Sequence, residues 1–334
     1  PWLALPSDFS SVPPDSFAAP VLRFGAFGFG RGVYRDTLML YSDVSGKDSV
    51  RVPVIMRVPS ARFGDHANGG LRLTVTDEGA VGFVDLTQSP VSEERYGSGL
   101  VFPRGGGANL LYHGGLWVGS DSAHVSDDTY DYDWRARPGG HLAFTPGEPL
   151  ASTATFDDSG RAASLGLVVR QTGTSYSASG RDGFVMLRYS IRNASASTLH
   201  ALYVAYYLDL DVPPNPLRNV GAADSTRAMI YLSDSAGTYA PCAGVALLTP
   251  QRARALRMVN NAVYVYPYVN VRDVDKYPLM SAPLYDLATT STTDWSILAS
   301  AGPFELAAGE SLDVAFAVLA AASVSDLRAQ ADMA

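Results

Sequence analysis

Two carboxylates stand at the end of an apolar stretch of the chain. Residues 199–212 alternate in a way that predicts an extended strand with both faces largely buried, and side chains two apart share a face. Asp209 and Asp211 therefore project together, with their Cα atoms about 6.5–7 Å apart. Pro213 and Pro214 end the strand, because proline cannot donate a ladder hydrogen bond. This strand end is the first candidate site.

Oxygen-bearing side chains continue into the loop that follows. Carboxylate and amide oxygens are the ligands that Ca²⁺ prefers, and the ion takes six to eight of them. The predicted calcium ligands are Asp209, Asp211, Asn215, Asn219 and Asp224. The alternative is a solvated acidic loop, because no EF-hand or repeat spacing accompanies these residues.

A second group of acids lies just before Trp134. Its members are Asp121, Asp127, Asp128, Asp131 and Asp133. A surface position is expected for this group, and Ca²⁺ binding is the alternative. Paired carboxylates also suggest a glycosidase, but its two acids must flank the scissile bond from opposite sides. Asp209 and Asp211 lie on one strand and point the same way, which disfavours that interpretation of this pair.

The chain lacks the spacing typical of nucleophilic or phosphate-binding sites. No Gly-x-Ser-x-Gly sequence is present, and the five histidines show neither triad spacing nor the His-Glu-x-x-His spacing of metallopeptidases. Gly105–Gly107 precedes a strand-like run, so it predicts a tight turn and not a phosphate-binding loop. Ca²⁺ is the one cofactor that the sequence suggests.

Aromatic side chains offer another kind of site. Flat amphipathic rings bury a large area at low entropy cost, so they suit stacking on sugars or on protein surfaces. The candidate platform residues are Tyr130, Tyr132, Trp134, Tyr264, Tyr266 and Tyr268. With 18 tyrosines in the chain, packing inside the fold is the alternative.

The elements that must position these residues are mostly strands. Turn residues separate nearly all of the β-forming runs, and this pattern is typical of a large antiparallel sandwich. A helical pattern occurs at Ser323–Ala334, where Ser323 or Ser325 could cap the first turn. The strands expected after residue 60 are Leu71–Thr76, Ala80–Asp85, Leu116–Gly119, Thr153–Phe156, Leu165–Gln171, Phe184–Asn193, the stretch 199–212, Ala228–Leu232, Gly244–Leu248, Ala262–Val269, Trp295–Ser300 and Leu312–Val318.

The composition is that of a folded, acidic protein. With 334 residues, 47% of them hydrophobic, the chain can bury a sizeable core in about two domains. A formal net charge of −8 without clustered Lys and Arg argues against a nucleic-acid partner. The single Cys242 excludes a disulfide framework within the chain. No apolar run reaches the roughly 18 residues of a membrane span, and the absent initiator Met indicates an excised piece of a longer protein.

The first 59 residues predict a separate module. Val50–Val58 alternates, Val33–Tyr41 is rich in β-formers, and Ser45–Asp48 has turn chemistry, so the three predict a hairpin. With Trp2 and the turn at Ser11–Pro14, the module resembles the small immunoglobulin-like repeats of bacterial surface and secreted proteins. The resemblance implies a spacer. The segment 59–70 lacks apolar periodicity, so the predicted domains are 1–59 and 60–334.

A second resemblance covers most of the larger domain. Residues 107–119, 130–135, 155–160 and 184–193, with the Tyr-x-Asp-x-Asp strand end at 207–211, resemble a β-sandwich region of secreted bacterial multidomain proteins. Some of those proteins are subtilisin-like peptidases with sorting or anchoring tails. The resemblance implies secretion and a non-catalytic accessory role.

These observations predict an all-β chain, a small immunoglobulin-like sandwich and then a large antiparallel β-sandwich with a short C-terminal helix. The main functional prediction is a non-catalytic extracellular or cell-surface accessory or structural region that spaces, anchors, binds a ligand or assembles into a surface layer or filament. Its partner would be a protein or glycan at the cell surface, or copies of the chain itself. The alternative is a carbohydrate-active enzyme with carboxylates on separate loops, or the accessory part of a secreted subtilisin-like peptidase.

Overall fold

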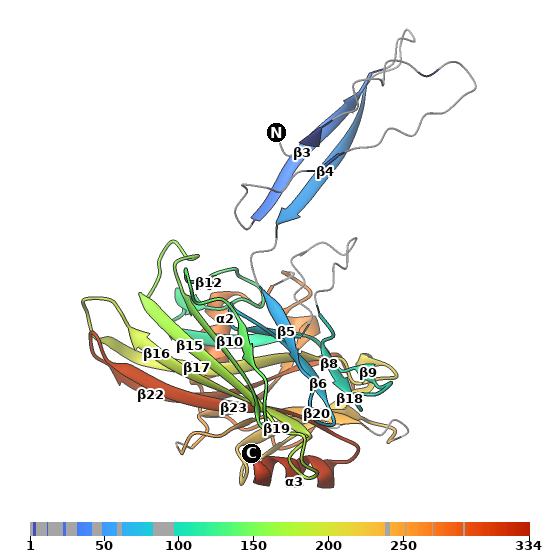
Figure 1. Ribbon diagram of the computed structural model, residues 1–334, viewed down its shortest axis with the longest axis vertical. Helices are drawn as coiled ribbons and strands as arrows, with labels where there is room; N and C mark the ends of the chain where they lie inside the picture. The colour runs from blue at the N-terminus through green and yellow to red at the C-terminus, as the bar shows by residue number, and fades with distance from the viewer. Residues whose placement is uncertain are drawn as a thin grey trace. The chain divides into compact units, whose positions relative to one another are not determined.

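A computed structural model describes residues 3–4, 12, 23–24, 32–41, 49–58, 62–82, 97–237, 241–250, 252–268, 270–289 and 291–334 (Figure 1). The chain divides into two compact units, Pro1–Ser60 and Ala61–Ala334. We describe each unit by itself.

In the first unit, the described strands form two antiparallel pairs. β1 (Leu3–Ala4) pairs with β2 (Arg23–Phe24), and β3 (Gly32–Leu40) pairs with β4 (Val50–Val58). The predicted hairpin is therefore confirmed. Its predicted turn at Ser45–Asp48 lies outside the described residues, as do Trp2 and most of the turn at residues 11–14.

The alternating sequence of β4 predicts one buried face, but the described valines of that face are not all buried. Val54 is buried, whereas Val50 is 58% exposed and Val52 is 37% exposed. Alternation marks which side chains share a face, but it does not say whether anything covers that face.

In the second unit, two large antiparallel sheets pack face to face. Among the described residues, the first sheet has ten strands in the order β21-β22-β17-β10-β7-β6-β8-β9, with β11 beside β10 and β5 beside β6. Its strands are β5 (Phe63–His66), β6 (Arg72–Thr76), β7 (Ala80–Gly82), β8 (Leu100–Phe102), β9 (Ala108–Asn109), β10 (Leu111–Asp121), β11 (His124–Ser126), β17 (Leu199–Leu210), β21 (Ala255–Asn260) and β22 (Trp295–Leu306).

The second sheet has nine strands in the described part of the chain. Their order is β12-β14-β15-β16-β23-β20-β19-β18, with β13 beside β14. They are β12 (Arg135–Ala136), β13 (Ala143–Thr145), β14 (Leu150–Asp157), β15 (Leu167–Ser175), β16 (Phe184–Asn193), β18 (Asn219–Asp224), β19 (Met229–Asp234), β20 (Cys242–Leu247) and β23 (Ser311–Ala321). Figure 1 shows the broad arrangement of these strands.

β17 is buried on both faces, as its sequence predicts. Leu202 and Val204 pack in the main core between the two sheets. Tyr203, Ala205 and Tyr207 point to the opposite face and pack in a second core. Because successive side chains of a strand alternate between faces, β17 contributes to two separate cores.

Helices cover the outer faces of the sheets. α2 (Asp273–Ser281) packs over β22 and β17, and its Leu279 and Met280 belong to the second core. α3 (Val324–Met333) packs on β23 of the other sheet through buried Leu327. The predicted C-terminal helix is confirmed, and the side chain of Ser323 caps it by accepting from the Asp326 N–H.

One predicted strand is wrong. Residues 262–264 of the expected strand Ala262–Val269 belong to the helix α1 (Asn261–Tyr264). The Asn260 side chain accepts a hydrogen bond from the Ala262 N–H and so starts a helical turn where the tyrosines at every second position suggested a strand. A short 3₁₀ helix at Pro216–Arg218 completes the described helices. The fold class is confirmed as antiparallel β-sandwich with a short C-terminal helix.

Candidate functional site

Three neighbouring strands of the ten-stranded sheet, and the helix α1 that follows a fourth, bring polar residues together. Asp209 on β17 stands opposite His113 on β10 and opposite Ser296 on β22. Ser296 in turn stands opposite Val259 on β21, two residues before Asn261. Register thus gathers residues that are up to 183 positions apart in the sequence (113 to 296).

Hydrogen bonds join these residues into a network that we call the carboxyl cluster. Asn261 Nδ2 donates to Asp209 Oδ1 at 2.8 Å, and Ser296 Oγ lies 2.8 Å from the same oxygen and 2.6 Å from Asn261 Oδ1. Tyr207 OH donates to Ser296 Oγ at 2.7 Å. His113 Nε2 lies 3.9 Å from Asp209 Oδ2. The cluster consists of Asp209, His113, Tyr207, Asn261 and Ser296, with Asp294 and Tyr266 at its edge.

The proton count favours a neutral Asp209. Burial raises the pKa of Asp209, although hydrogen bonds from Asn261 and Ser296 act in the other direction. Ser296 has one hydroxyl proton and two oxygen neighbours that could accept it, Asp209 Oδ1 and Asn261 Oδ1. A protonated Asp209 removes this shortage, because it can donate to Ser296 Oγ while Ser296 donates to Asn261. Burial and the hydrogen-bond geometry thus both favour the protonated form of Asp209.

A second acid extends the carboxyl cluster to the surface. Asp294 lies two residues before Ser296, and burial followed by the neighbouring Asp209 raises its pKa. The Tyr266 hydroxyl donates to Asp294 Oδ2, and the Tyr266 side chain is 54% exposed. An exposed tyrosine thus binds one carboxyl group with a raised pKa, Asp294, which neighbours a second, Asp209.

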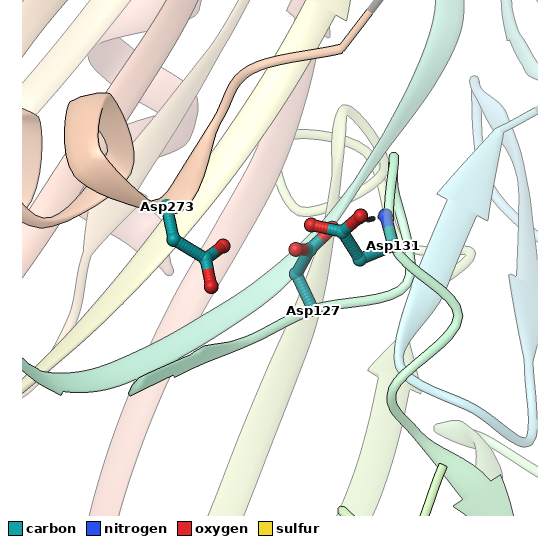
Figure 2. Close-up of side chains that lie close together, drawn as sticks. All are labelled: Asp127, Asp131 and Asp273. Atoms are coloured by element: carbon teal, nitrogen blue, oxygen red, sulfur yellow. Dashed lines mark hydrogen bonds between the residues drawn. The ribbon is translucent and has the colours of Figure 1, made fainter. Parts of the chain in front are cut away.

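A second network, the lysine cluster, ties α2 to the loop after β11. Lys276 Nζ lies 2.5 Å from Asp127 Oδ2, 2.5 Å from Asp131 Oδ2 and 3.1 Å from Asp273 Oδ1. Figure 2 shows the three carboxylates converging from the loop and from the first turn of the helix. Their oxygens lie within 4.8 Å of one another, as ligands of a metal ion would.

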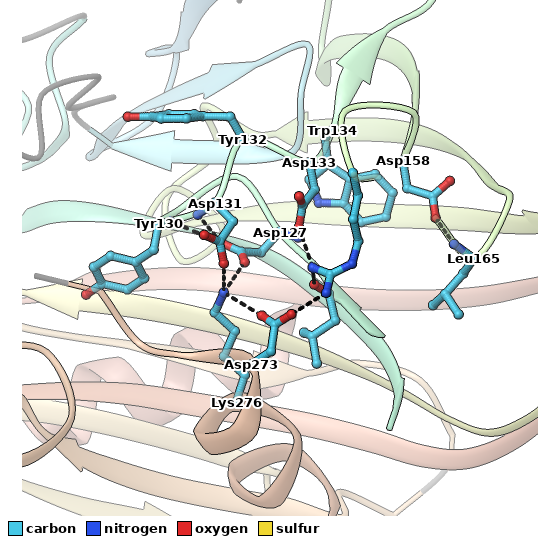
Figure 3. A network of polar contacts seen from close by, with 12 residues as sticks. Asp127, Tyr130, Asp131, Tyr132, Asp133, Trp134, Asp158, Leu165, Asp273 and Lys276 are labelled. Atoms are coloured by element: carbon cyan, nitrogen blue, oxygen red, sulfur yellow. Dashed lines mark hydrogen bonds and ion pairs between the residues drawn. The ribbon is translucent and has the colours of Figure 1, made fainter. Parts of the chain in front are cut away.

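Arg161 extends the lysine cluster. Figure 3 labels the four aspartates of the enlarged cluster and Lys276. The Arg161 guanidinium binds Asp273 at 2.5 Å and Asp133 at 3.2 Å, so the cluster holds four aspartates and two cations. Burial and the charge of Asp127 raise the pKa of Asp133 to about 7, in spite of Arg161. Burial and Asp127 also raise the pKa of Asp131. Protons held on these two acids would balance the charge of the cluster.

Asp127 and Lys276 form the charged centre of the lysine cluster. Burial opposes the charge on each, but their attraction outweighs it, so the pKa of Asp127 is lowered and that of Lys276 is raised. Both side chains are fully buried. The lysine ammonium stands where the three carboxylates would hold a cation. The arrangement therefore serves as an internal ion pair that fastens α2.

The predicted calcium ligands take several different positions. Asp209 belongs to the carboxyl cluster, and Asp211 follows the end of its strand. Asn215 caps the 3₁₀ helix, and Asn219 binds both backbone groups of Val212. The structure does not gather these side chains into one group of described ligands.

Asp224 and the remaining acids of the second group have their own partners. Asp224 pairs with Arg227 at 2.9 Å and with Arg328 at 3.1 Å. Asp121 is exposed and pairs with His124, as the expected surface position requires. Burial of Asp127, Asp128 and Asp133 contradicts a surface position for these three acids. Calcium binding stays a prediction.

The predicted aromatic platform is wrong in part. Trp134 is fully buried and Tyr130 is 6% exposed, because both pack in the cores that flank the ten-stranded sheet. Tyr132 and Tyr264 are half-buried. Tyr266 and Tyr268 are exposed, but Arg272 lies over the Tyr268 ring at 3.9 Å. Tyr266 is therefore the platform residue that lies beside the carboxyl groups.

Several residues of both clusters carry no sequence signal. His113, Asn261 and Ser296 reach Asp209 through strand register, and Lys276 and Asp273 reach Asp127 through a helix that the alternation did not predict. The Asp-x-x-Lys spacing at 273–276 is the one local hint, because it places both side chains on one helix face.

Comparisons with known proteins find solved structures whose folds are similar to that of this chain. No protein-family model matches the chain, and no curated protein does. A bacterial glucoamylase complexed with acarbose is similar at a TM-score of 0.49 and 11% identity, over 90% of this chain and 38% of that one. A putative aldose 1-epimerase from Escherichia coli K12 has a TM-score of 0.43 and 10% identity, over 78% of this chain and 99% of that one.

A third solved structure is a heparan sulfate lyase from Pedobacter heparinus, with a TM-score of 0.35 and 10% identity. The likeness extends over 80% of this chain and 37% of the lyase. The chain thus spans less than half of the glucoamylase and of the lyase.

The comparisons correct the main functional prediction. The similar structures include proteins described as a glucoamylase, putative aldose 1-epimerases and a heparan sulfate lyase. These findings contradict the predicted non-catalytic accessory role, and the likeness itself extends to the fold alone. Among the described helices none is long and apolar enough to cross a membrane.

Proposed function

We propose that this chain is a carbohydrate-active enzyme and that the carboxyl cluster is its acid–base centre. The observation that carries the proposal is the placement of a buried acid, Asp209, near a half-buried acid from another segment, Asp294, which binds the exposed side chain of Tyr266. All the solved structures named above have TM-scores under 0.5, so the site alone supports the proposal.

The two acids differ in their surroundings. Asp209 is 8% exposed and keeps a proton because burial disfavours its charge, which suits a general acid. Asp294 is half-buried and enters from a different segment of the chain, before β22. Asp209 and Asp211 were disfavoured as a catalytic pair because they lie on one strand and point the same way. Asp209 and Asp294 come from different segments, so that objection does not apply to them.

A sugar suits the rim of this site. Carboxyl groups and amides bind sugar hydroxyls, and an aromatic face binds the C–H face of a sugar ring. Tyr266 offers such a ring, and its hydroxyl is held by Asp294. Asp209 would donate a proton to the substrate, Asp294 would bind or deprotonate it, and Tyr266 would position it.

The test is turnover by the purified chain on a panel of oligosaccharides and free sugars. Asp209→Asn keeps the size and the hydrogen-bonding capacity of a neutral carboxyl group, so this variant should fold. We expect its kcat/KM to fall by about 100-fold or more, because it has no acidic proton. Activity should also decline as pH rises through the raised pKa of Asp209 and deprotonates the acid.

The matched control is Asp313→Asn. Asp313 pairs with Arg188 on the nine-stranded sheet, away from the carboxyl cluster, and this variant should keep normal turnover. No turnover on any sugar, or turnover that survives Asp209→Asn with an unchanged pH profile, would contradict the proposal.

A further inference from the structure

A pocket of about 540 Å³ lies at the other end of β21 from the carboxyl cluster. Its lining includes Arg252, Arg254, Tyr285, Leu287 and Gly302. β21 is six residues long, so a rise of about 3.3 Å per residue puts the two sites roughly 20 Å apart. The pocket is of the size that small-molecule sites have, about 300–1,000 Å³.

Each of the two arginines of the pocket is held by a hydrogen bond from its Nε–H group. Arg252 Nε donates to Tyr285 OH at 3.2 Å, and Arg254 Nε donates to the Ser281 carbonyl at 2.7 Å. The Tyr285 hydroxyl in turn donates to the backbone carbonyl of Ala253. These bonds fix the direction of both guanidinium groups, so little ordering is left for a ligand to impose.

No carboxylate of the described residues neutralises these arginines. Arg257, next along β21, pairs with Asp286 at 3.3 Å, whereas Arg252 and Arg254 form no such ion pair in the described part of the chain. Their terminal nitrogens likewise make no hydrogen bond there. The pocket thus presents two oriented guanidinium groups that have no carboxylate partner among the described residues.

We propose that this pocket binds a small organic molecule through an oxyanion group, a carboxylate or a phosphate. The guanidinium fork matches two oxygens of such a group and gives charge-assisted hydrogen bonds. Leu287, Pro283 and Ala253 supply apolar surface for the body of the ligand. The site is separate from the carboxyl cluster and does not depend on its proposed function.

Binding is measured by calorimetry, not by turnover, with three probes: glucuronate, glucose 6-phosphate and neutral glucose. We expect one or both anions to bind and glucose to bind at least tenfold more weakly. Glucuronate and glucose 6-phosphate distinguish the two sources of the oxyanion. Raising NaCl from 50 to 500 mM should weaken the anion binding, because salt screens exposed charges.

Two variants test the arginines separately. Arg252→Gln removes an exposed guanidinium, and Arg254→Lys keeps the charge but loses the fork, so each should raise the Kd of the anion about tenfold or more. The control is Arg188→Gln, an exposed arginine of the nine-stranded sheet, which should leave the Kd unchanged.

Absence of anion binding, equal binding of glucose and the anions, or an unchanged Kd in Arg252→Gln would overturn the proposal. A melting curve of each variant shows that the fold is kept. Loss of turnover in Asp209→Asn with anion binding intact would leave this proposal standing, so the two proposals can fail independently.

Discussion

His66 shows how a single buried side chain can make stability depend on pH. The imidazole is fully buried, and its two ring nitrogens lie 2.8 Å from the hydroxyls of Ser152 and Ser175. Burial lowers the pKa of His66 from 6.5 to about 4, with Asp65 acting weakly in the other direction. The folded protein therefore holds a neutral imidazole in a site that disfavours the charged form.

The folded pKa lies below the unfolded one, so this stability is present above pH 6.5 and is lost as pH falls toward 4. At pH 5 the unfolded chain is protonated at His66 and the folded chain is not, which costs about 2 kcal/mol relative to pH 7.5. Urea unfolding at the two pH values should show this loss in the native protein and a smaller loss in His66→Gln.

The control for this pH effect is His200→Gln. His200 is exposed and pairs with Glu305 at the surface, so its replacement should leave the pH dependence of unfolding as in the native protein. A loss in His66→Gln equal to that of the native protein would refute the role of His66.

At the scale of elements, α2 is held to the sheet by a buried ion pair as well as by apolar packing. Leu279 and Met280 pack in the second core, while Lys276 reaches Asp127 and Asp131 in the loop after β11. A buried pair of this kind adds little over a well-packed apolar pair, but removing one partner leaves a charge unpaired in the interior.

Lys276→Met keeps the apolar stem and removes the ammonium, so three carboxylates lose their shared cation. We expect a loss of about 3–5 kcal/mol in the free energy of unfolding. Added Ca²⁺ should recover part of that loss in Lys276→Met, because the three oxygens already lie within 4.8 Å of one another. Thermal unfolding with and without 5 mM CaCl₂ measures both effects.

Arg272→Met is the control on the same helix. Arg272 is exposed and pairs with Asp275, and such surface pairs contribute little. Equal melting temperatures for the two variants, with no response of Lys276→Met to Ca²⁺, would show that the lysine cluster does not fasten α2.

Local sequence pattern predicts the strands well and the short helices poorly. The sequence predicts Phe184–Asn193 with the bounds that β16 has, because Val185, Leu187, Tyr189 and Ile191 alternate with less buried residues over most of the strand. α2 escaped prediction because Pro278 lies inside it and its apolar residues are few. The tyrosines at 264, 266 and 268 have the two-residue spacing of a strand, although Asn260 starts a helix there.

The candidate site was predictable only where it lies on one strand. Asp209 follows from the alternation of β17, together with the two prolines that end it. Ser296, Asn261 and Asp294 could not be paired with Asp209, because register between strands depends on the whole sheet and not on local spacing.

At the scale of the whole molecule, the cores of the larger unit consist, in the described part of the chain, of that unit's own residues. The apolar clusters between the sheets, under α2 and under α3 all consist of residues from 71 onward. We therefore expect residues 61–334 to fold alone. Its far-ultraviolet circular dichroism should be dominated by strand, and its main melting transition should match that of the full chain.

Two further observations would test that expectation. Native-like exchange protection at β16, β17 and β23 in the shortened chain would support it. A shortened chain that has no cooperative transition would contradict it, because it would show that residues 1–60 complete one of the cores.

The order of strands also bears on how the chain is made. β22 lies between β17 and β21, and β23 lies between β16 and β20, so each sheet is completed by a strand from the C-terminal end of the chain. During synthesis, β16 and β17 leave the ribosome with one edge each unpaired until residues 295–321 follow them. Open strand edges are templates for pairing with other chains. The newborn protein is therefore most prone to aggregation in the interval before β22 and β23 emerge, and slow synthesis of residues 295–321 would lengthen that interval.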